Sequence, residues 1–293
     1  MHRRIASGQA ETARRAGVQG LKHFAPESVK DAGGFLRTLP SFTHDPHLVK
    51  KLLYLLLALI ALLAAVGWWL HEPRPEGQSG AAADALARDM MAAVNAQAWD
   101  STGAVRWTFP GGHQHLWDRQ RHLAQVRWDD YEVLVNLNTR RGVAFENGTK
   151  LSAGETEDLV EQAWAFWVND AFWLNPVVKA FDQGTERLLV DTEGDPKALL
   201  VRYRSGGATP GDAYLWHLDP ETKRPQRWKM WVSVIPVGGL SATWSGWQQL
   251  ATGAWVATHH EMGPVPLEIT DLTGASTLTE LAGGEDPFAP LAR

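Results

Sequence analysis

The sequence contains no cysteine. It therefore has no disulfides, no thiolate metal ligands, no cysteine nucleophile and no cysteine that could carry the lipid of a bacterial lipoprotein. It also lacks an excess of positive charge, since 28 Lys and Arg stand against 33 Asp and Glu. Nucleic acid is excluded as a main partner, because phosphate binding needs clustered Lys and Arg. Any membrane attachment has to come from the polypeptide itself.

One long uncharged run lies in the first quarter of the chain. Residues 52–70 contain no charged side chain, and a helix of that length spans about 28 Å, close to the thickness of the hydrocarbon layer. We predict a transmembrane helix at 51–70, bounded by Lys50 and Lys51 on one side and by two interfacial tryptophans on the other. A buried helix of a soluble protein and a cleaved signal peptide are the alternatives.

Positive charge is concentrated before this run. Nine Lys or Arg lie in residues 1–51, whereas Arg74 and Arg88 are the only ones soon after it. The positive-inside rule therefore predicts a basic cytoplasmic tail at 1–50. In a Gram-negative bacterium, the chain would cross the inner membrane once and place its C-terminal part in the periplasm. The tail is either a solvated segment or an amphipathic helix that touches anionic lipid.

Composition divides the remainder into a linker and a domain. Residues 71–81 are rich in Pro, Gly and Ser and predict a linker, followed by a domain at 82–280 and a C-terminal tail at 281–293. One helix is predicted to end near Asp100, and another to begin at the capping box Ser152–Glu155.

Short alternating segments before and after this second helix predict five and about seven antiparallel strands. We therefore expect a mainly β fold of the α+β type. It would be one large curved antiparallel sheet, or half-open barrel, with lid helices inside it or across its mouth.

The second predicted helix leads into an unusually aromatic stretch. WAFWVNDAFWLNP, residues 164–176, holds three tryptophans and two phenylalanines. These rings either fill an interior or line a cavity for an apolar ligand. Half or more of the domain's other tryptophans are expected to be plain core, because a large sheet has to be covered. They are Trp107, Trp128, Trp216, Trp228, Trp231, Trp244, Trp247 and Trp255.

Three local motifs have counterparts in a known family. HLWDRQRHLAQVRW, residues 115–128, predicts a strand pair, ENGTKL, residues 146–151, a hairpin, and WHLDPETKRPQRWKM a later hairpin. Together they resemble the LolA/LolB-like family of lipoprotein-localisation carriers and receptors in the Gram-negative envelope. The likeness covers roughly residues 85–275. It implies an unclosed antiparallel barrel whose helical lids enclose an apolar cavity for acyl chains.

The resemblance also implies a set of lipid-binding and lid residues. They are Trp164, Phe166, Trp167, Phe172 and Trp173, with Trp128 from the strand pair, and with Arg119 or Arg121 as the basic residue that holds the lid by hydrogen bonds. The carrier is soluble and the receptor is lipid-anchored, whereas this chain keeps a predicted spanning helix. Only the fold and the type of cavity are therefore carried over.

Histidines offer a metal site as an alternative. His113 and His115 lie two apart on a predicted strand, so both rings face the same side, and His259 with Asp118 or Glu261 could complete a zinc site. Nothing in the sequence makes these strands neighbours. Histidines on strand rims are therefore the preferred interpretation, and no metal or cofactor is predicted. Since no G-x-S-x-G elbow or other nucleophile motif is present, an enzyme is not expected.

Two functions remain open. The first is a membrane-tethered periplasmic domain that binds a lipid or a lipoprotein acyl chain. The second is a non-catalytic interaction or structural protein of the envelope, whose interior is filled and which binds another protein. A His-rich metal-dependent enzyme is the third alternative. Several hundred Å³ of continuous apolar space would favour the first function, and a solid interior the second.

Overall fold

The computed structural model describes residues 46–192, 197–206 and 209–292. The predicted basic tail, residues 1–50, lies almost wholly outside the described residues. The chain divides into two compact units, Met1–Leu55 and Leu56–Arg293. The first unit is described only through the start of helix α1 (Pro46–Leu70).

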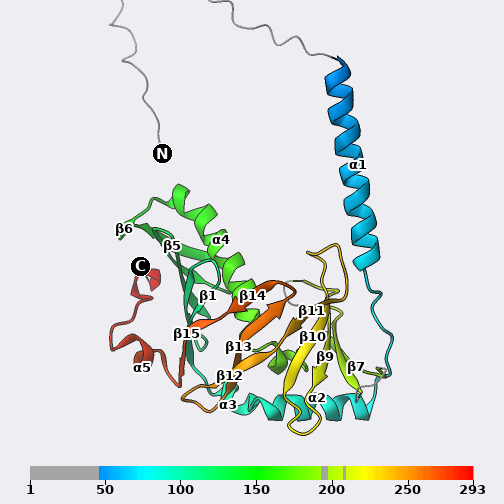
Figure 1. The fold of residues 1–293 in the computed structure, drawn as a ribbon. Helices are drawn as coiled ribbons and strands as arrows, with labels where there is room; N and C mark the ends of the chain where they lie inside the picture. The colour runs from blue at the N-terminus through cyan, green and yellow to red at the C-terminus, as the bar shows by residue number, and fades with distance from the viewer. Residues whose placement is uncertain (1–45, 193–196, 207–208, 293) are drawn as a thin grey trace, which may run out of the picture. The chain divides into compact units, whose positions relative to one another are not determined.

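Helix α1 is the apolar helix predicted at 51–70 (Figure 1). Its residues His47–Leu70 are long and apolar enough to cross a membrane, and within the described ranges it is the one such helix. None of this span is buried, and Trp68 and Trp69 near its end are 86% and 82% exposed. The helix is apolar on all sides, which is typical of a membrane span.

The residues that follow α1 are hydrogen-bonded to the folded domain. Two residues after the helix ends, the backbone N–H of Glu72 donates to the Gly238 carbonyl at 3.0 Å, and the Glu72 carbonyl accepts from the Trp231 indole at 2.7 Å. The Lys229 ammonium binds both Glu72 carboxylate oxygens, at 2.7 and 2.8 Å. Gln78 pairs with the edge of a sheet in an isolated bridge. Residues 71–78 of the predicted linker at 71–81 therefore form a strap bound to the domain, and the linker's last residue, Ala81, begins a helix.

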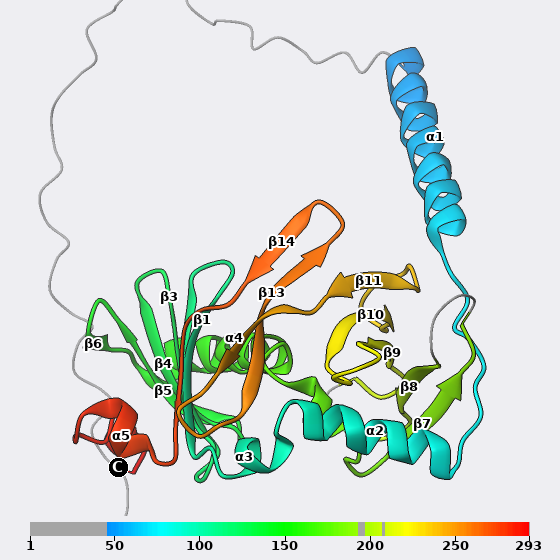
Figure 2. The same ribbon diagram turned by 60° about the horizontal axis from the view of Figure 1, so that its bottom comes forward.

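The strands form three antiparallel sheets (Figures 1 and 2). The first contains, in spatial order, β15 (Thr270–Ala275), β1 (Ala104–Phe109), β2 (His113–Asp118), β3 (Leu123–Trp128), β4 (Tyr131–Asn136), β5 (Arg141–Glu146) and β6 (Thr149–Lys150). The second contains β11 (Leu240–Thr243), β10 (Pro225–Trp231), β9 (Ala213–Leu218), β8 (Ala198–Tyr203) and β7 (Thr185–Val190). The third contains β12 (Ser245–Gln249), β13 (Trp255–Met262) and β14 (Val265–Glu268).

This architecture confirms the predicted mainly β, antiparallel fold with helices. Within the described residues none of the sheets closes into a barrel. The strands expected in one sheet are divided among three, and a single residue, Trp244, separates β11 of the second sheet from β12 of the third. Its backbone N–H donates to the Gln226 carbonyl at 2.7 Å and its side chain is 2% exposed. Burial of this indole fixes the point at which the chain passes between sheets.

The first predicted helix is two helices, contrary to the expectation of one. α2 (Ala81–Ala93) and α3 (Ala96–Asp100) are separated by Asn95, whose φ of 53° is left-handed. A left-handed residue ends a helix. The Asn95 amide donates to the Gly253 carbonyl at 3.0 Å. The break between the two helices therefore coincides with a tertiary contact. The local run of helix-forming residues does not predict the break.

Helix α4 (Ala153–Phe172) begins at the predicted capping box, which is present at Ser152 and Glu155. It lies on one face of the first sheet, against β3, β4 and β5 (Figure 2). The helix ends at Phe172, and the chain continues into the short 3-10 helix η1 (Pro176–Lys179). The aromatic stretch therefore belongs only in part to the helix.

The main hydrophobic core lies where the three sheets, α2 and the end of α4 meet. Its fully buried side chains include Trp107 of β1, Leu199 of β8, Trp228 of β10 and Val256 of β13, each 0% exposed. A smaller cluster lies between α4 and the first sheet, around Val160. One shared core thus holds the separate sheets together.

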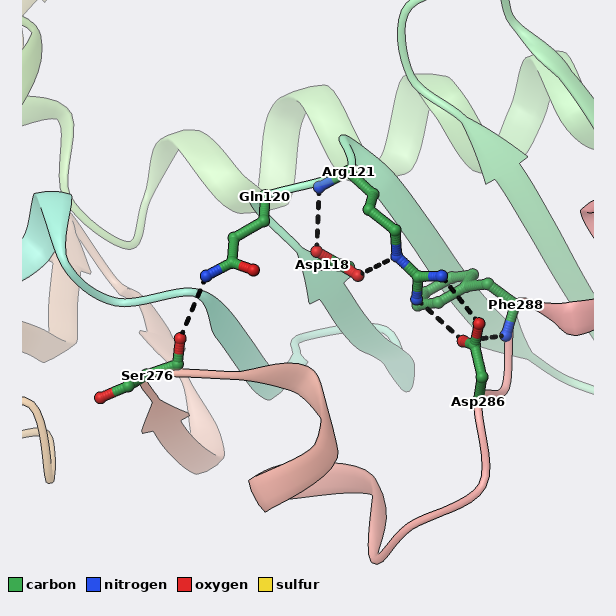
Figure 3. A network of polar contacts seen from close by, with 6 residues as sticks. All are labelled: Asp118, Gln120, Arg121, Ser276, Asp286 and Phe288. Carbon is green, nitrogen blue, oxygen red and sulfur yellow. Dashed lines mark hydrogen bonds and ion pairs between the residues drawn. The ribbon is translucent and has the colours of Figure 1, made fainter.

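The predicted C-terminal tail at 281–293, described up to residue 292, is docked on the first sheet. After α5 (Leu278–Ala282), the guanidinium of Arg121 donates to both carboxylate oxygens of Asp286, at 2.7 and 2.8 Å, and to Asp118 at 2.6 Å (Figure 3). The Phe288 N–H donates to Asp286 at 3.0 Å, and the Phe288 ring is 2% exposed. The chain then forms the short 3-10 helix η2 (Ala289–Ala292).

We predict that Asp286→Asn loosens this C-terminal segment without unfolding the domain, because it removes the charge that Arg121 binds. Amide hydrogen exchange of the full chain should become at least 10-fold faster at residues 286–292. The Arg121 hydrogen bonds hold the pKa of Asp286 below its ordinary value. The carboxylate is thus ionised in the wild type above about pH 4, and the contact is lost only on further acidification.

Arg127→Gln is the matched control, since Arg127 makes an exposed ion pair with Glu132 at 3.0 Å on the same sheet. It should leave exchange at residues 286–292 unchanged. Equal exchange in Asp286→Asn and the wild type would show that Phe288 alone holds the segment.

Candidate functional site

The predicted lid rings lie over two different parts of the domain. Phe166 stacks on His113 with ring centroids 3.8 Å apart and packs edge-on against Trp128 at 5.3 Å. Trp167 packs edge-on against Trp117 at 5.1 Å. These half-buried rings of α4 cover β2 and β3 of the first sheet.

Trp164 lies apart from the other predicted lid rings. The guanidinium carbon of Arg140 is 3.5 Å from the centroid of its ring, and the indole is half-buried. A cation over an exposed indole contributes about 0.5–1 kcal/mol. Trp164 therefore packs against a surface arginine.

Phe172 and Trp173 enter the main core. Phe172 lies 5.2 Å from Tyr214 and 6.1 Å from Trp228, measured between ring centroids. Trp173 lies 5.1 Å from Trp228 and 6.2 Å from Trp244. Trp173 is 8% exposed and Trp228 is 0% exposed.

Indoles fill the space beneath the end of α4. Trp216, Trp228 and Trp244 lie with their ring centroids 4.8 to 5.1 Å apart. With Trp173 they form a contiguous group, which we call the indole cluster. At these separations the rings are in direct contact. In this part of the domain the interior consists of packed side chains.

A small hollow lies beside the indole cluster, at the C-terminal end of α4. It has a volume of about 190 Å³ and is lined by Trp99, Asp100, Trp117, Arg119, Ala171, Phe172, Asn175, Val178, Lys179 and Asp182. Half of these lining residues are aromatic or aliphatic, and the other half are charged residues or asparagine. We call it the α4 hollow.

Arg119 forms part of that wall. Its guanidinium donates to the backbone carbonyls of Trp99 and Thr102, and it lies over the rings of Trp99, at 4.6 Å, and Trp117, at 5.3 Å. Burial lowers the pKa of Arg119, and its Nε has no hydrogen-bond partner in the described residues. Arg119 thus ties α3 to the end of β2 directly beneath α4.

Arg121, the other predicted lid arginine, binds the C-terminal segment (Figure 3). It borders a second hollow of about 350 Å³, whose lining is mainly polar and includes Asp118, Thr277 and Glu285. A polar lining of this kind is unsuited to an acyl chain.

A cluster of two histidines and an aspartate lies between β2 and α4. Nδ1 of His113 is 2.9 Å and Nε2 of His115 is 2.7 Å from the same carboxylate oxygen of Asp170. The Asn169 amide donates to the other oxygen at 2.9 Å. Asp170 is 1% and His115 is 2% exposed, and burial lowers the pKa of His115.

The two strand histidines do share a face, as their spacing predicts. His259 lies elsewhere, 3.3 Å from both Glu261 and Glu268 on the third sheet, and Asp118 is bound by Arg121. Sequence reasoning missed Asp170, which comes from α4. The sequence feature that could have identified Asp170 is its position as the one carboxylate inside the aromatic stretch, where an unpaired charge would be costly.

Comparison with known proteins gives only distant likenesses. No protein-family model matches the chain, and no curated protein matches its sequence. A LolA superfamily protein from Nitrosomonas europaea is 13% identical with a TM-score of 0.31, covering 58% of this chain and 82% of its own. A DUF1329 family protein from Desulfovibrio piger is 12% identical with a TM-score of 0.35, covering 66% and 92%.

A Vibrio parahaemolyticus domain described as an outer membrane lipoprotein-sorting protein is 10% identical with a TM-score of 0.28, covering 67% of this chain and 96% of its own. The function proposed below rests on this chain's own residues.

We predict that Trp228→Ala destabilises the domain by about 3–5 kcal/mol, because the indole is fully buried among other rings. Trp164→Ala should cost about 1 kcal/mol or less, since its main partner is the surface Arg140. Denaturant unfolding of the full chain, followed by far-ultraviolet circular dichroism, measures both. Similar losses in the two variants would contradict the placement of the indole cluster as core.

Proposed function

We propose that the chain is a single-pass protein of a bacterial inner membrane, with its N-terminus in the cytoplasm and its domain in the periplasm. Three features support this: the exposed apolar helix α1, the basic residues before it, and the tryptophans at its other end. The strap at 71–78 joins the span to the domain without a free linker, because Glu72 is already bound to the second sheet.

A fusion of alkaline phosphatase to the C-terminus should therefore be active in cells, because this enzyme needs the oxidising periplasm to form its disulfides. A C-terminal fluorescent protein that matures only in the cytoplasm should be dark. An inactive phosphatase together with a bright fluorescent protein would show the opposite orientation. Release of the full chain from membranes by alkaline carbonate would contradict the proposal that α1 spans the membrane.

The domain, in our proposal, is non-catalytic and binds the acyl chain of a lipid or lipoprotein at the α4 hollow. The observation that carries this is the mixed lining of the hollow of about 190 Å³, in which Trp99, Trp117 and Phe172 form an apolar part of the wall next to charged residues. Each methylene buried against such rings contributes about 0.8 kcal/mol. The cationic side chains of Arg119 and Lys179 on this wall can pair with a carboxylate or phosphate at the polar end of the ligand.

The hollow has to widen to take a long chain. Ligand pockets commonly measure about 300–1,000 Å³, more than the α4 hollow offers. The last turn of α4 and η1 contribute Ala171, Phe172 and Val178 to its wall. Because Trp173, Leu174 and Val177 anchor this segment in the main core, the opening that the proposal requires is a movement of the half-buried side chains at the wall, such as Val178.

The indole cluster favours a second candidate function. Because Trp173 and Trp228 already fill the interior, the domain can also serve as a permanently closed interaction module of the envelope. Its partner would then be another protein, added to a free strand edge. β14 offers such an edge, with Val265 59% exposed.

A photoactivatable fatty acid distinguishes the two functions. The full chain is reconstituted in nanodiscs of phosphatidylethanolamine and phosphatidylglycerol, irradiated, and digested for mass spectrometry. Acyl binding predicts labelled peptides from the lining of the α4 hollow in addition to labelled α1. Label confined to α1 would refute acyl binding at the hollow and favour the interaction module.

Val178→Trp should reduce photolabelling of the peptides that line the α4 hollow at least 5-fold, because Val178 lines the hollow and an indole would occupy the space. Val234→Trp is the matched control, since Val234 is 75% exposed in the loop between β10 and β11. Labelling of α1 should be equal in both variants. Undiminished labelling of the hollow peptides in Val178→Trp would place the bound chain elsewhere.

A further inference from the structure

We propose that His113, His115 and Asp170 form a binding site for a divalent transition metal ion, with zinc as the best fit to the donors. This inference is independent of the acyl-binding function. It rests on the arrangement of the donors, on the burial of the charge, and on the way the rings are held.

The three donors converge from two elements. His113 and His115 project from one face of β2, and Asp170 faces them from α4. Their ligand atoms all lie within 4.8 Å of one another, and in the described part of the chain this is the one such group of three. In a tetrahedral zinc site, ligand atoms lie about 3.3 Å apart, as follows from bonds of about 2.0–2.1 Å. The two contacts with Asp170, 2.7 and 2.9 Å, need to lengthen by only about half an ångström.

Charge balance also favours a cation at this place. Asp170 is 1% exposed, and the ion pairs recorded for it are with the two imidazoles. A buried carboxylate is costly unless positive charge or hydrogen-bond donors lie against it. A divalent ion among the same three groups would add positive charge beside the carboxylate.

Neighbouring side chains hold the ligands in place. The His115 ring stacks on Trp107 at 4.4 Å, and the His113 ring stacks on Phe166 at 3.8 Å. The Asn169 amide donates to the carboxylate oxygen of Asp170 that faces away from the histidines. Such outer contacts are what orient metal ligands in proteins. Nδ1 of His115 has no partner, so it can carry the ring proton when Nε2 binds the ion.

The site is open on one side. The side chain of His113 is 18% exposed, whereas those of His115 and Asp170 are 0% and 1% exposed. An ion can therefore enter past His113, beside the Gly111–Gly112 turn. Three protein ligands leave a fourth position for water, whereas a structural zinc site is closed by four protein ligands. A bound ion would link α4 to β2 at the level of the aromatic stretch.

The test uses the full chain in detergent, purified without a histidine tag and stripped with chelator. Addition of Zn²⁺ is followed by calorimetric titration and by thermal unfolding. At 100-fold excess over Kd we expect the midpoint of unfolding to rise by about 5–10 °C. Co²⁺ in place of Zn²⁺ should give the visible absorption of a four-coordinate ion. A wild-type chain that takes up neither ion would overturn the proposal.

Asp170→Asn tests the carboxylate, because it keeps the size of the side chain and an oxygen that accepts from the imidazoles. This variant should no longer bind one Zn²⁺ per chain, and Zn²⁺ should no longer raise its midpoint of unfolding. His113→Gln, at the exposed side of the cluster, should weaken binding at least 10-fold and guards against a folding defect in the first variant. His259→Gln is the matched control, since His259 also lies beside carboxylates but outside the cluster. Unchanged uptake in both cluster variants would place any bound metal elsewhere.

Discussion

The packing of the end of α4 into the main core is the interaction on which the other features depend. Trp173 contacts Trp228 and Trp244, and Leu174 and Val177 beyond it are fully buried. This core draws side chains from all three sheets and from α2. Since the sheets are not joined to one another by a continuous hydrogen-bond ladder, burial of these rings is what holds them in one domain.

The same helix end places both proposed sites. Asp170 lies two residues before Phe172, so one turn of α4 contributes a ligand to the histidine cluster and a ring to the α4 hollow. Each site contains a charged residue among aromatic side chains, the buried Asp170 in one and the half-buried Arg119 in the other. A buried charge with few partners is energetically costly in an ordinary core. Arg121, by contrast, is engaged with Asp118 and Asp286 at the surface.

Features set by neighbouring residues could be predicted well. The apolar helix α1, the capping box at Ser152 and Glu155, and the antiparallel hairpins are all present. Each depends on contacts between residues a few positions apart, and so the local sequence contains the information. The break at Asn95 was not predictable in this way, because the residue that its side chain contacts, Gly253, lies 158 positions along the chain.

By itself the sequence determined the composition limits, the apolar helix, the alternation of strands and the common face of His113 and His115. Only the tertiary structure decided that the strands form three sheets, that Asp170 meets both imidazoles, and that Trp173 enters the core instead of covering an open cavity. The physical reason is that periodicity tells which side chains turn inward, but not which ones meet there. That choice depends on the volumes of rings contributed by distant strands, which have to fill one interior without voids.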